Sequence, residues 1–189
     1  MDVRIVMNEF GTHLTTRPAG IRDFGRVCER LANVRPGDTV LLDFEQVEYV
    51  SASWIAAMMV PLSRRASEEA NDFFLLIGQF PNNSLDDLQL VAEQAHIPFL
   101  VVTDFMPIPS KAKLLGILDF GQKETLSVVQ QMGEVTGAML AAMRPEFKAS
   151  GPAWNNRLKD LFEKRLLRRR KQGRDQIYKL IVSEVIVNG

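Results

Sequence analysis

The residues best suited to bind a polyanion are gathered in the last third of the chain. Arg144 to Leu180 contains 12 Lys and Arg residues against 4 Asp and Glu residues, a net charge of +8. The rest of the 189 residues contains 11 basic and 19 acidic residues, a net charge of −8, so the overall charge of zero hides two oppositely charged parts. A basic segment suits a phosphate-rich partner, whereas the acidic remainder does not.

The basic segment lies in a stretch whose pattern predicts three helices and a hairpin. The helical periodicity covers about Lys123 to Met132, Thr136 to Met143 and Pro152 to Arg165. Two extended runs follow, Leu166 to Lys171 and Gln176 to Ile181, on either side of Gln172-Gly173-Arg174. This order is the plan of a winged helix-turn-helix domain, in which the third helix enters the major groove of DNA and the hairpin lies along the backbone.

The third of these helices has an apolar stripe and a polar face. Trp154, Leu158 and Leu161 share the stripe and should pack inward. The polar face presents Ala153, Asn155, Asn156 and Lys159 to base edges, where Asn can pair bidentately with adenine. Pro152 suits the first helical turn, whose N-terminus favours a phosphate. The hairpin adds cations that neutralise phosphates or enter the minor groove: Arg168, Arg170, Lys171 and Arg174.

Other interpretations of the same residues stay open. Trp154 fits the core better than a wedge between bases, because it lies in the apolar stripe. Arg168 to Lys171 could be a solvated strand edge that resists aggregation, and the two Asn residues could be ordinary exposed helix positions. Winged helices also bind proteins, so the arrangement alone does not decide the function.

The segment from Gly151 to Ile181 resembles the recognition helix and wing of bacterial winged-helix regulators of the MarR and ArsR type. The matching residues are Asn156-Arg157-Leu158, Leu161, Leu166-Leu167-Arg168, Gly173-Arg174 and Tyr178. With Gly133-Glu134-Val135-Thr136 opening the preceding helix, the resemblance covers roughly residues 115 to 182. It implies double-stranded DNA as the partner and adds Arg157 to the candidate DNA contacts.

The first hundred residues alternate strand-like and helical segments, which indicates an α/β fold around one sheet. Strands are expected near Val3 to Met7, Thr39 to Phe44, Phe73 to Ile77 and Phe99 to Val102, the last three buried. Helices are expected around Ile21 to Leu31, Ile55 to Leu62 and Leu85 to Val91, the last capped by Ser84 with Asp87. Pro107, Pro109 and Lys111 to Lys113 then interrupt the pattern, so we expect domains at 1–110 and 111–189.

Residues 14 to 62 resemble the STAS-like domains related to anti-sigma-factor antagonists, and the likeness extends over nearly all of residues 1 to 105. The residues that carry it are Thr16-Arg17, Leu42-Asp43-Phe44, Val47 and Val50-Ser51-Ala52-Ser53-Trp54. In STAS proteins a partner kinase phosphorylates a Ser or Thr in the strand-to-helix loop, and the surrounding surface docks that kinase or a signalling ATPase. Here Ala52 stands at the acceptor position and Trp54 replaces a glycine, so the usual hydroxyl is missing.

This likeness makes Arg17, Ser51, Ser53 and Trp54 the candidate partner-docking residues. Ser51 and Ser53 could each cap the following helix or accept a phosphate. Arg17 stands just before a helix, where its charge opposes the helix dipole, so either a specific carboxylate or a ligand should hold it. Both alternatives stay open for each of these three residues.

Metal, disulfide and catalytic chemistry are not expected. Cys28 is the single cysteine and lies on an apolar helical stripe, so it is expected to be a small core residue. His13 and His96 are far apart and lack a zinc-ligand spacing, and Asp43 and Glu45 have no His, Lys or nucleophile in a recurrent spacing beside them. Because no glycine-rich phosphate loop or nucleophile–base pair appears, we expect no enzyme and no cofactor.

These expectations combine into a bacterial regulator of transcription, with an α/β STAS-like sensor domain and a mainly α-helical winged-helix domain that binds DNA. The alternative is a signalling adaptor that binds a histidine-kinase-like ATPase or another protein through both domains without binding DNA. A homodimer is left open, since palindromic sites usually imply dimers but no dimerisation helix is evident. The longest apolar run, Trp54 to Leu62, is about half of the ~20 residues that span a bilayer, and Met1 to Phe10 lacks a secretory pattern, so a soluble, cytoplasmic protein without membrane contact is expected.

Overall fold

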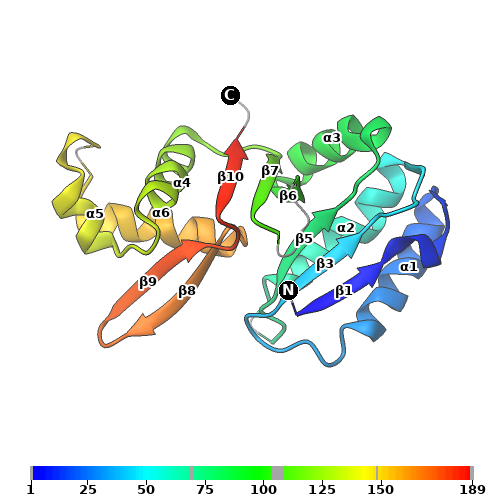
Figure 1. The fold of residues 1–189 in the computed structure, drawn as a ribbon, viewed down its shortest axis with the longest axis horizontal. Coiled ribbons are helices and arrows are strands. Elements are labelled where there is room, and N and C mark those ends of the chain that lie inside the picture. The colour runs from blue at the N-terminus through cyan, green and yellow to red at the C-terminus, as the bar shows by residue number, and fades with distance from the viewer. Residues whose placement is uncertain (1, 69, 104–108, 148, 188–189) are drawn as a thin grey trace. The chain divides into compact units, whose positions relative to one another are not determined.

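The computed structural model describes residues 2–68, 70–103, 109–147 and 149–187. The chain divides into two compact units, the first made of residues 1–117 with 185–189 and the second of residues 118–184 (Figure 1). Within the described ranges, no helix is both long and apolar enough to cross a membrane.

The first unit is built on a six-stranded mixed sheet. Its strands are β1 (Val3–Val6), β3 (Thr39–Asp43), β5 (Phe74–Gly78), β6 (Phe99–Val102), β7 (Lys111–Leu115) and β10 (Glu184–Val187), which lie in that order across the sheet. The first four are parallel, and β7 runs antiparallel to β6. The α/β fold and the four strands expected from the sequence are therefore confirmed.

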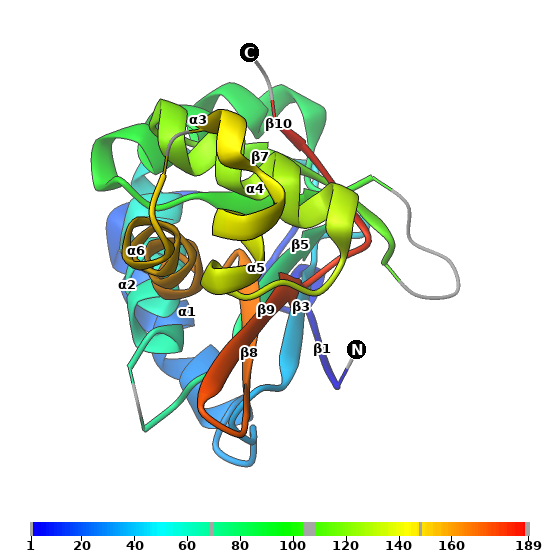
Figure 2. The same cartoon turned by 90° about the vertical axis from the view of Figure 1, so that its left-hand side faces the viewer.

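Three helices connect the parallel strands: α1 (Arg17–Arg30), α2 (Ala52–Ala66) and α3 (Leu85–Ala95). Because consecutive parallel strands are neighbours and such crossovers are right-handed, all three helices fall on the same face of the sheet. Figure 2 shows α1 and α2 together on one side of β1 and β3. The core between these layers is apolar, with Val40, Leu42, Ile55, Met58 and Leu62 fully buried.

A glycine allows α1 and α2 to approach closely. A Cβ atom placed on Gly20 of α1 would lie 2.8 Å from the Ala57 Cβ and 2.9 Å from the Trp54 carbonyl oxygen of α2. Real Cβ atoms do not come so close to a backbone oxygen, so the crossing requires glycine at this position.

The second unit contains three helices followed by an antiparallel hairpin. The helices are α4 (Phe120–Met132), α5 (Gly137–Met143) and α6 (Gly151–Glu163), and the hairpin strands are β8 (Leu167–Gln172) and β9 (Asp175–Leu180). The second unit also contains a short 3-10 turn, η3 (Pro145–Phe147), and the first unit contains two, η1 (Met7–Phe10) and η2 (Asn82–Ser84). The three helices and the hairpin are the elements expected from the sequence, and α4 begins earlier because Asp119 and Gln122 form a capping box.

Two features of the first unit differ from the expectation. Residues 111–115 form strand β7, although its lysines resembled a break in the pattern, and β10 lies beside β7 at the edge of the same sheet. The expected division at residue 110 would assign both strands to the C-terminal domain, whereas the structure includes β7 and most of β10 in the first unit. The alternation of Lys111 and Lys113 with buried Ala112 and Leu114 is the signal for β7.

The expected cap of α3 is wrong. Ser84 occupies the N-cap position, but its side chain makes no capping hydrogen bond. Its Oγ accepts instead from the Val50 backbone N–H at 2.9 Å, and the Asp87 carboxylate accepts from the Ala52 N–H at 3.1 Å. Ser84 therefore fixes Val50, two residues before α2, and Asp87 fixes the first residue of α2, which are tertiary roles that local spacing does not reveal.

Candidate functional site

Helix α6 carries most of the residues expected to meet nucleic acid, and its apolar stripe holds it in place. Trp154, Leu158 and Leu161 are fully buried, so the expectation that Trp154 belongs to the core is confirmed. The Phe147 ring packs edge-on against Trp154 at 5.6 Å between centroids. The helix begins at a Ser150 cap, whose hydroxyl accepts from the Ala153 N–H at 3.4 Å.

The polar face of α6 is open at most of the expected positions. Pro152, Asn156 and Lys159 are exposed and Ala153 is half-buried, while Lys159 also pairs with Glu163 at 3.5 Å. Surface pairs of this kind are weak, so the Lys159 ammonium can exchange Glu163 for another anion. This face therefore presents the Asn156 amide and, farther along the helix, the Lys159 cation to solvent.

Two of the expected contacts are engaged within the unit. Asn155 is exposed but lies close against α5, since a Cβ on Gly137 would fall 2.1 Å from its Oδ1. The Arg157 guanidinium is directed toward α4, where it lies 3.6 Å from the Glu124 carboxylate and beside Gly121. Arg157 therefore joins α6 to α4, and Asn155 contributes to the crossing of α5 and α6.

The hairpin arranges its cations on two faces. In the β8–β9 register, Arg168 lies opposite Lys179 and Arg170 lies opposite Ile177, so these residues share one face. Arg169 lies on the other face and stacks over the Phe162 ring at 4.1 Å. The hairpin is joined to the helices by Val135, which forms an isolated β-bridge with Tyr178.

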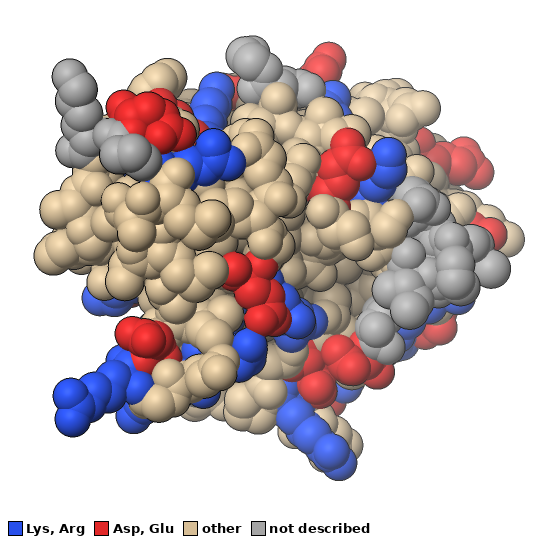
Figure 3. Space-filling view, turned by 60° about the vertical axis from the view of Figure 1, so that its left-hand side comes forward, with Lys and Arg blue, Asp and Glu red and all other residues tan. Residues whose placement is uncertain are grey.

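Lys171 and Arg174 are the cations at the far end of the hairpin. Both are exposed, and neither side chain makes a hydrogen bond or ion pair with the part of the chain that the structure describes. Gly173 beside Arg174 has a φ of 62°, which allows the tight turn. Figure 3 shows Lys and Arg side chains that project into solvent at the lower left of the view.

In the first unit, the starts of α1 and α2 lie side by side. The short strands β2 (His13–Leu14) and β4 (Tyr49–Val50) pair in parallel, and the Ser51 N–H donates to the Leu14 carbonyl at 3.0 Å. The Ser51 hydroxyl accepts from the Trp54 N–H at 3.3 Å, so Ser51 caps α2, as one of the two expectations stated. Ser53 is exposed, and its Oγ lies 3.1 Å from that of Ser51.

The other two candidate docking residues have opposite environments. Arg17 is exposed, and no carboxylate in the described ranges pairs with it. Trp54 is fully buried, donates from its indole N–H to the Asp23 carboxylate at 3.0 Å and contacts the Phe44 ring edge-on. Its side chain is therefore part of the core and does not present a surface to a partner.

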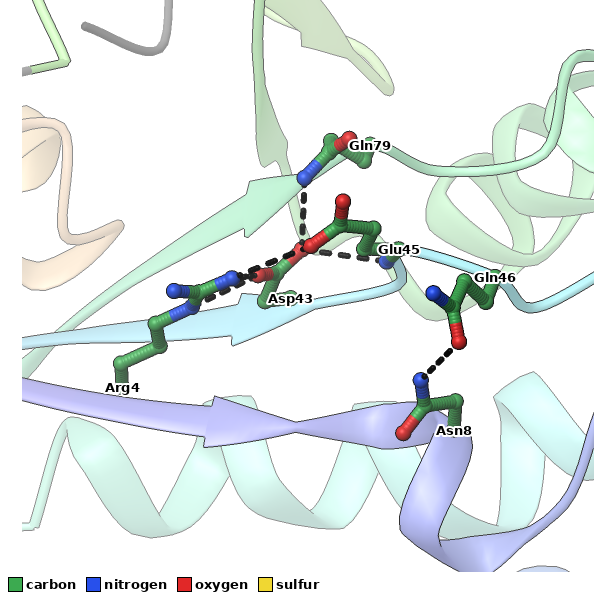
Figure 4. Close-up of polar contacts among 6 residues, drawn as sticks. All are labelled: Arg4, Asn8, Asp43, Glu45, Gln46 and Gln79. Carbon is green, nitrogen blue, oxygen red and sulfur yellow. Dashed lines mark hydrogen bonds and ion pairs between the residues drawn. The ribbon is translucent and has the colours of Figure 1, made fainter.

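A polar cluster around the buried carboxylate of Asp43, near the carboxyl ends of β3 and β5, was not expected from the sequence (Figure 4). The Asp43 carboxylate is fully buried and accepts from the Arg4 guanidinium, from the Gln79 amide at 3.2 Å and from the Glu45 backbone N–H at 3.1 Å. Asn8 and Gln46 form a second contact nearby, at 3.1 Å. Since Asp43 has all these donors and no adjacent nucleophile among the described residues, the cluster fixes the strand ends rather than supplying acid–base chemistry.

Cys28 is half-buried rather than fully buried. Burial raises the pKa of its thiol, an effect that nearby Arg65 partly opposes. A raised pKa leaves less of the reactive thiolate at neutral pH. Cys28 is thus poorly suited to nucleophilic chemistry.

Comparisons of the chain with models of protein families, with curated proteins and with solved structures find no match.

Proposed function

We propose that this protein is a bacterial cytoplasmic regulator in which residues 118–184 form a winged helix that binds double-stranded DNA. The observation that carries the proposal is the pair of exposed cations, Lys171 and Arg174, which have no partner in the described part of the chain. They lie at the end of a hairpin that follows the exposed polar face of α6. The β-bridge between Val135 and Tyr178 supports the same interpretation, because it adds a third extended segment beside the hairpin.

Each part of this module would have a separate role on DNA. The N-terminal half of α6 would enter the major groove, with Asn156 at a base edge and the helix N-terminus near a phosphate. Lys159 would bind the backbone, while Lys171 and Arg174 would reach phosphates or the minor groove beside the bound helix. Arg157 would keep its structural role between α6 and α4.

The α/β unit would be a STAS-like module that docks a protein partner, for which a kinase-like ATPase is the candidate class. Arg17 and Ser53 are its supporting residues, because both are exposed where the starts of α1 and α2 meet. Ala52 lacks a hydroxyl, so phosphorylation would have to use Ser51, whose hydroxyl caps α2, or the exposed Ser53, or leave this loop unmodified. Docking would then regulate the DNA-binding module.

Fluorescence anisotropy tests the DNA proposal directly. The full chain is titrated into a labelled random duplex at several salt concentrations, and the logarithm of Kd is plotted against the logarithm of salt. We expect a slope that corresponds to several released counterions, about 0.9 for each neutralised phosphate. Absence of binding even at low salt would overturn the proposal and favour the alternative function, a signalling adaptor. Recovery of an ATPase that binds the α/β unit would then support the adaptor.

A further inference from the structure

We propose that Glu134 is an intramolecular counterion that competes with DNA phosphates for Arg170 and Lys179, and thereby limits non-specific binding. The inference rests on the proposed DNA-binding function and concerns how the same surface is regulated. Glu134 belongs to the loop between α4 and α5, outside the residues expected to contact DNA.

The backbone holds Glu134 beside the hairpin. The next residue, Val135, exchanges two backbone hydrogen bonds with Tyr178 of β9, at 3.0 and 2.8 Å. Val135 and Tyr178 are both buried, so their neighbours in the alternation, Glu134 and Lys179, are directed to the opposite, solvated face. Arg170 reaches this face from β8.

The carboxylate of Glu134 contacts both cations. One oxygen accepts from the Arg170 Nη2 at 2.7 Å, and the other lies 3.7 Å from the Lys179 Nζ. Arg170 is held further by the Gln172 amide oxygen, which accepts from its Nη1 at 2.8 Å. The hydrogen bond from Arg170 is also the main cause of the lowered pKa of Glu134, so the carboxylate stays ionised at neutral pH.

This arrangement is open to exchange. The side chains of Glu134, Arg170 and Lys179 are 45%, 51% and 51% exposed, so solvent and other anions reach all three groups. Exposed ion pairs are weak and are screened by salt, and a phosphate offers the same oxygen chemistry as a carboxylate. DNA must therefore displace Glu134 before Arg170 and Lys179 can neutralise its backbone.

The cost of this displacement is the same for every DNA sequence. This cost lowers the affinity for random duplex. A specific sequence offsets the cost through the additional contacts that α6 makes with its bases. Glu134 would thus limit the occupancy of random DNA without touching it, while the ratio of specific to random affinity stays the same.

The test compares E134Q with wild type by anisotropy on random duplex across a salt series. The change preserves shape and removes one negative charge, so we expect E134Q to bind about threefold to tenfold more tightly, with a salt slope steeper by about 0.9 for each phosphate gained. E146Q is the matched control, because Glu146 forms an exposed pair with Arg144 in the same unit at 3.5 Å. We expect E146Q to stay within about twofold of wild type, since Arg144 is not a proposed DNA contact.

A second comparison assigns the effect to the two cations. In the R170A/K179A background, the change from Glu134 to Gln should alter the affinity much less than in wild type. Equal affinities and slopes for wild type and E134Q would overturn the inference while leaving DNA binding intact. Weaker binding by E134Q would also overturn it, because Glu134 would then position Arg170 for DNA. No binding by either protein would instead overturn the proposed function.

Discussion

The Trp54 indole N–H donates to the buried Asp23 carboxylate, across the contact between α2 and α1. The STAS resemblance expected from the sequence would align Trp54 with a glycine of the loop that carries the phosphoacceptor. Here that position anchors two helices, and Arg22 and Arg26 place their guanidinium groups 3.3 and 3.7 Å from the same Asp23 carboxylate. Trp54 is therefore a central element of the core of the first unit.

Replacing Trp54 with Phe should destabilise the protein by about 1–3 kcal/mol beyond the effect of lost volume, because Asp23 loses its buried donor. Far-UV circular dichroism during urea unfolding measures the change. Trp154→Phe is the matched control, since that indole is equally buried and its N–H has no partner in the described ranges. An equal loss for both variants would show that the Trp54 hydrogen bond contributes nothing.

Gly20→Ala should be destabilising by about 1–3 kcal/mol, because the added Cβ would meet the Trp54 backbone of α2 and force the two helices apart. Gly25→Ala in the same helix is the control, since a Cβ at that position would extend into open space. That change should stabilise the helix by about 0.5–1 kcal/mol. Thermal unfolding measures both, and shifts of Tm in the same direction would contradict the close crossing of α1 and α2.

Arg4→Met should destabilise the first unit by about 1–3 kcal/mol, since it leaves the buried Asp43 carboxylate without its cation. We expect the lower part of this range, because the Arg4 side chain is 43% exposed and solvent screens its charge. Adding Asp43→Asn should recover part of the loss, because no uncompensated charge then remains. Urea unfolding in which the double variant is less stable than Arg4→Met alone would contradict the role given to Arg4.

Local patterns predicted the elements well where one periodicity dominated. The apolar runs of β3, β5 and β6 and the stripe of Trp154, Leu158 and Leu161 each require burial wherever they pack. Strand β7 was not predicted, because the exposed Lys111 and the half-buried Lys113 mask a short alternation of polar and apolar residues. A mixed strand of five residues offers too little pattern to separate it from a loop.

The polar contacts could not be predicted, because tertiary packing brings their partners together. Arg4 and Asp43 are 39 residues apart, and Glu134 and Arg170 are 36 residues apart. Likewise, Ser84 and Asp87 have the spacing of a helix cap, but they bind the backbone of Val50 and of Ala52, the first residue of α2. Charge and spacing identified the cations of the hairpin. Only the fold shows that Arg170 is paired with Glu134, whereas the side chains of Lys171 and Arg174 have no partner in the described ranges.

The most direct test of DNA binding is the salt dependence of Kd for the double variant K171A/R174A, measured on random duplex. Its control is R35A/R64A, which removes two exposed cations from the α/β unit and gives the same total charge. We expect K171A/R174A to bind about tenfold or more weakly, with a salt slope shallower by about 2, because each lost phosphate contact reduces the slope by about one. Equal affinities and slopes for the two variants would contradict the claim that the hairpin binds DNA.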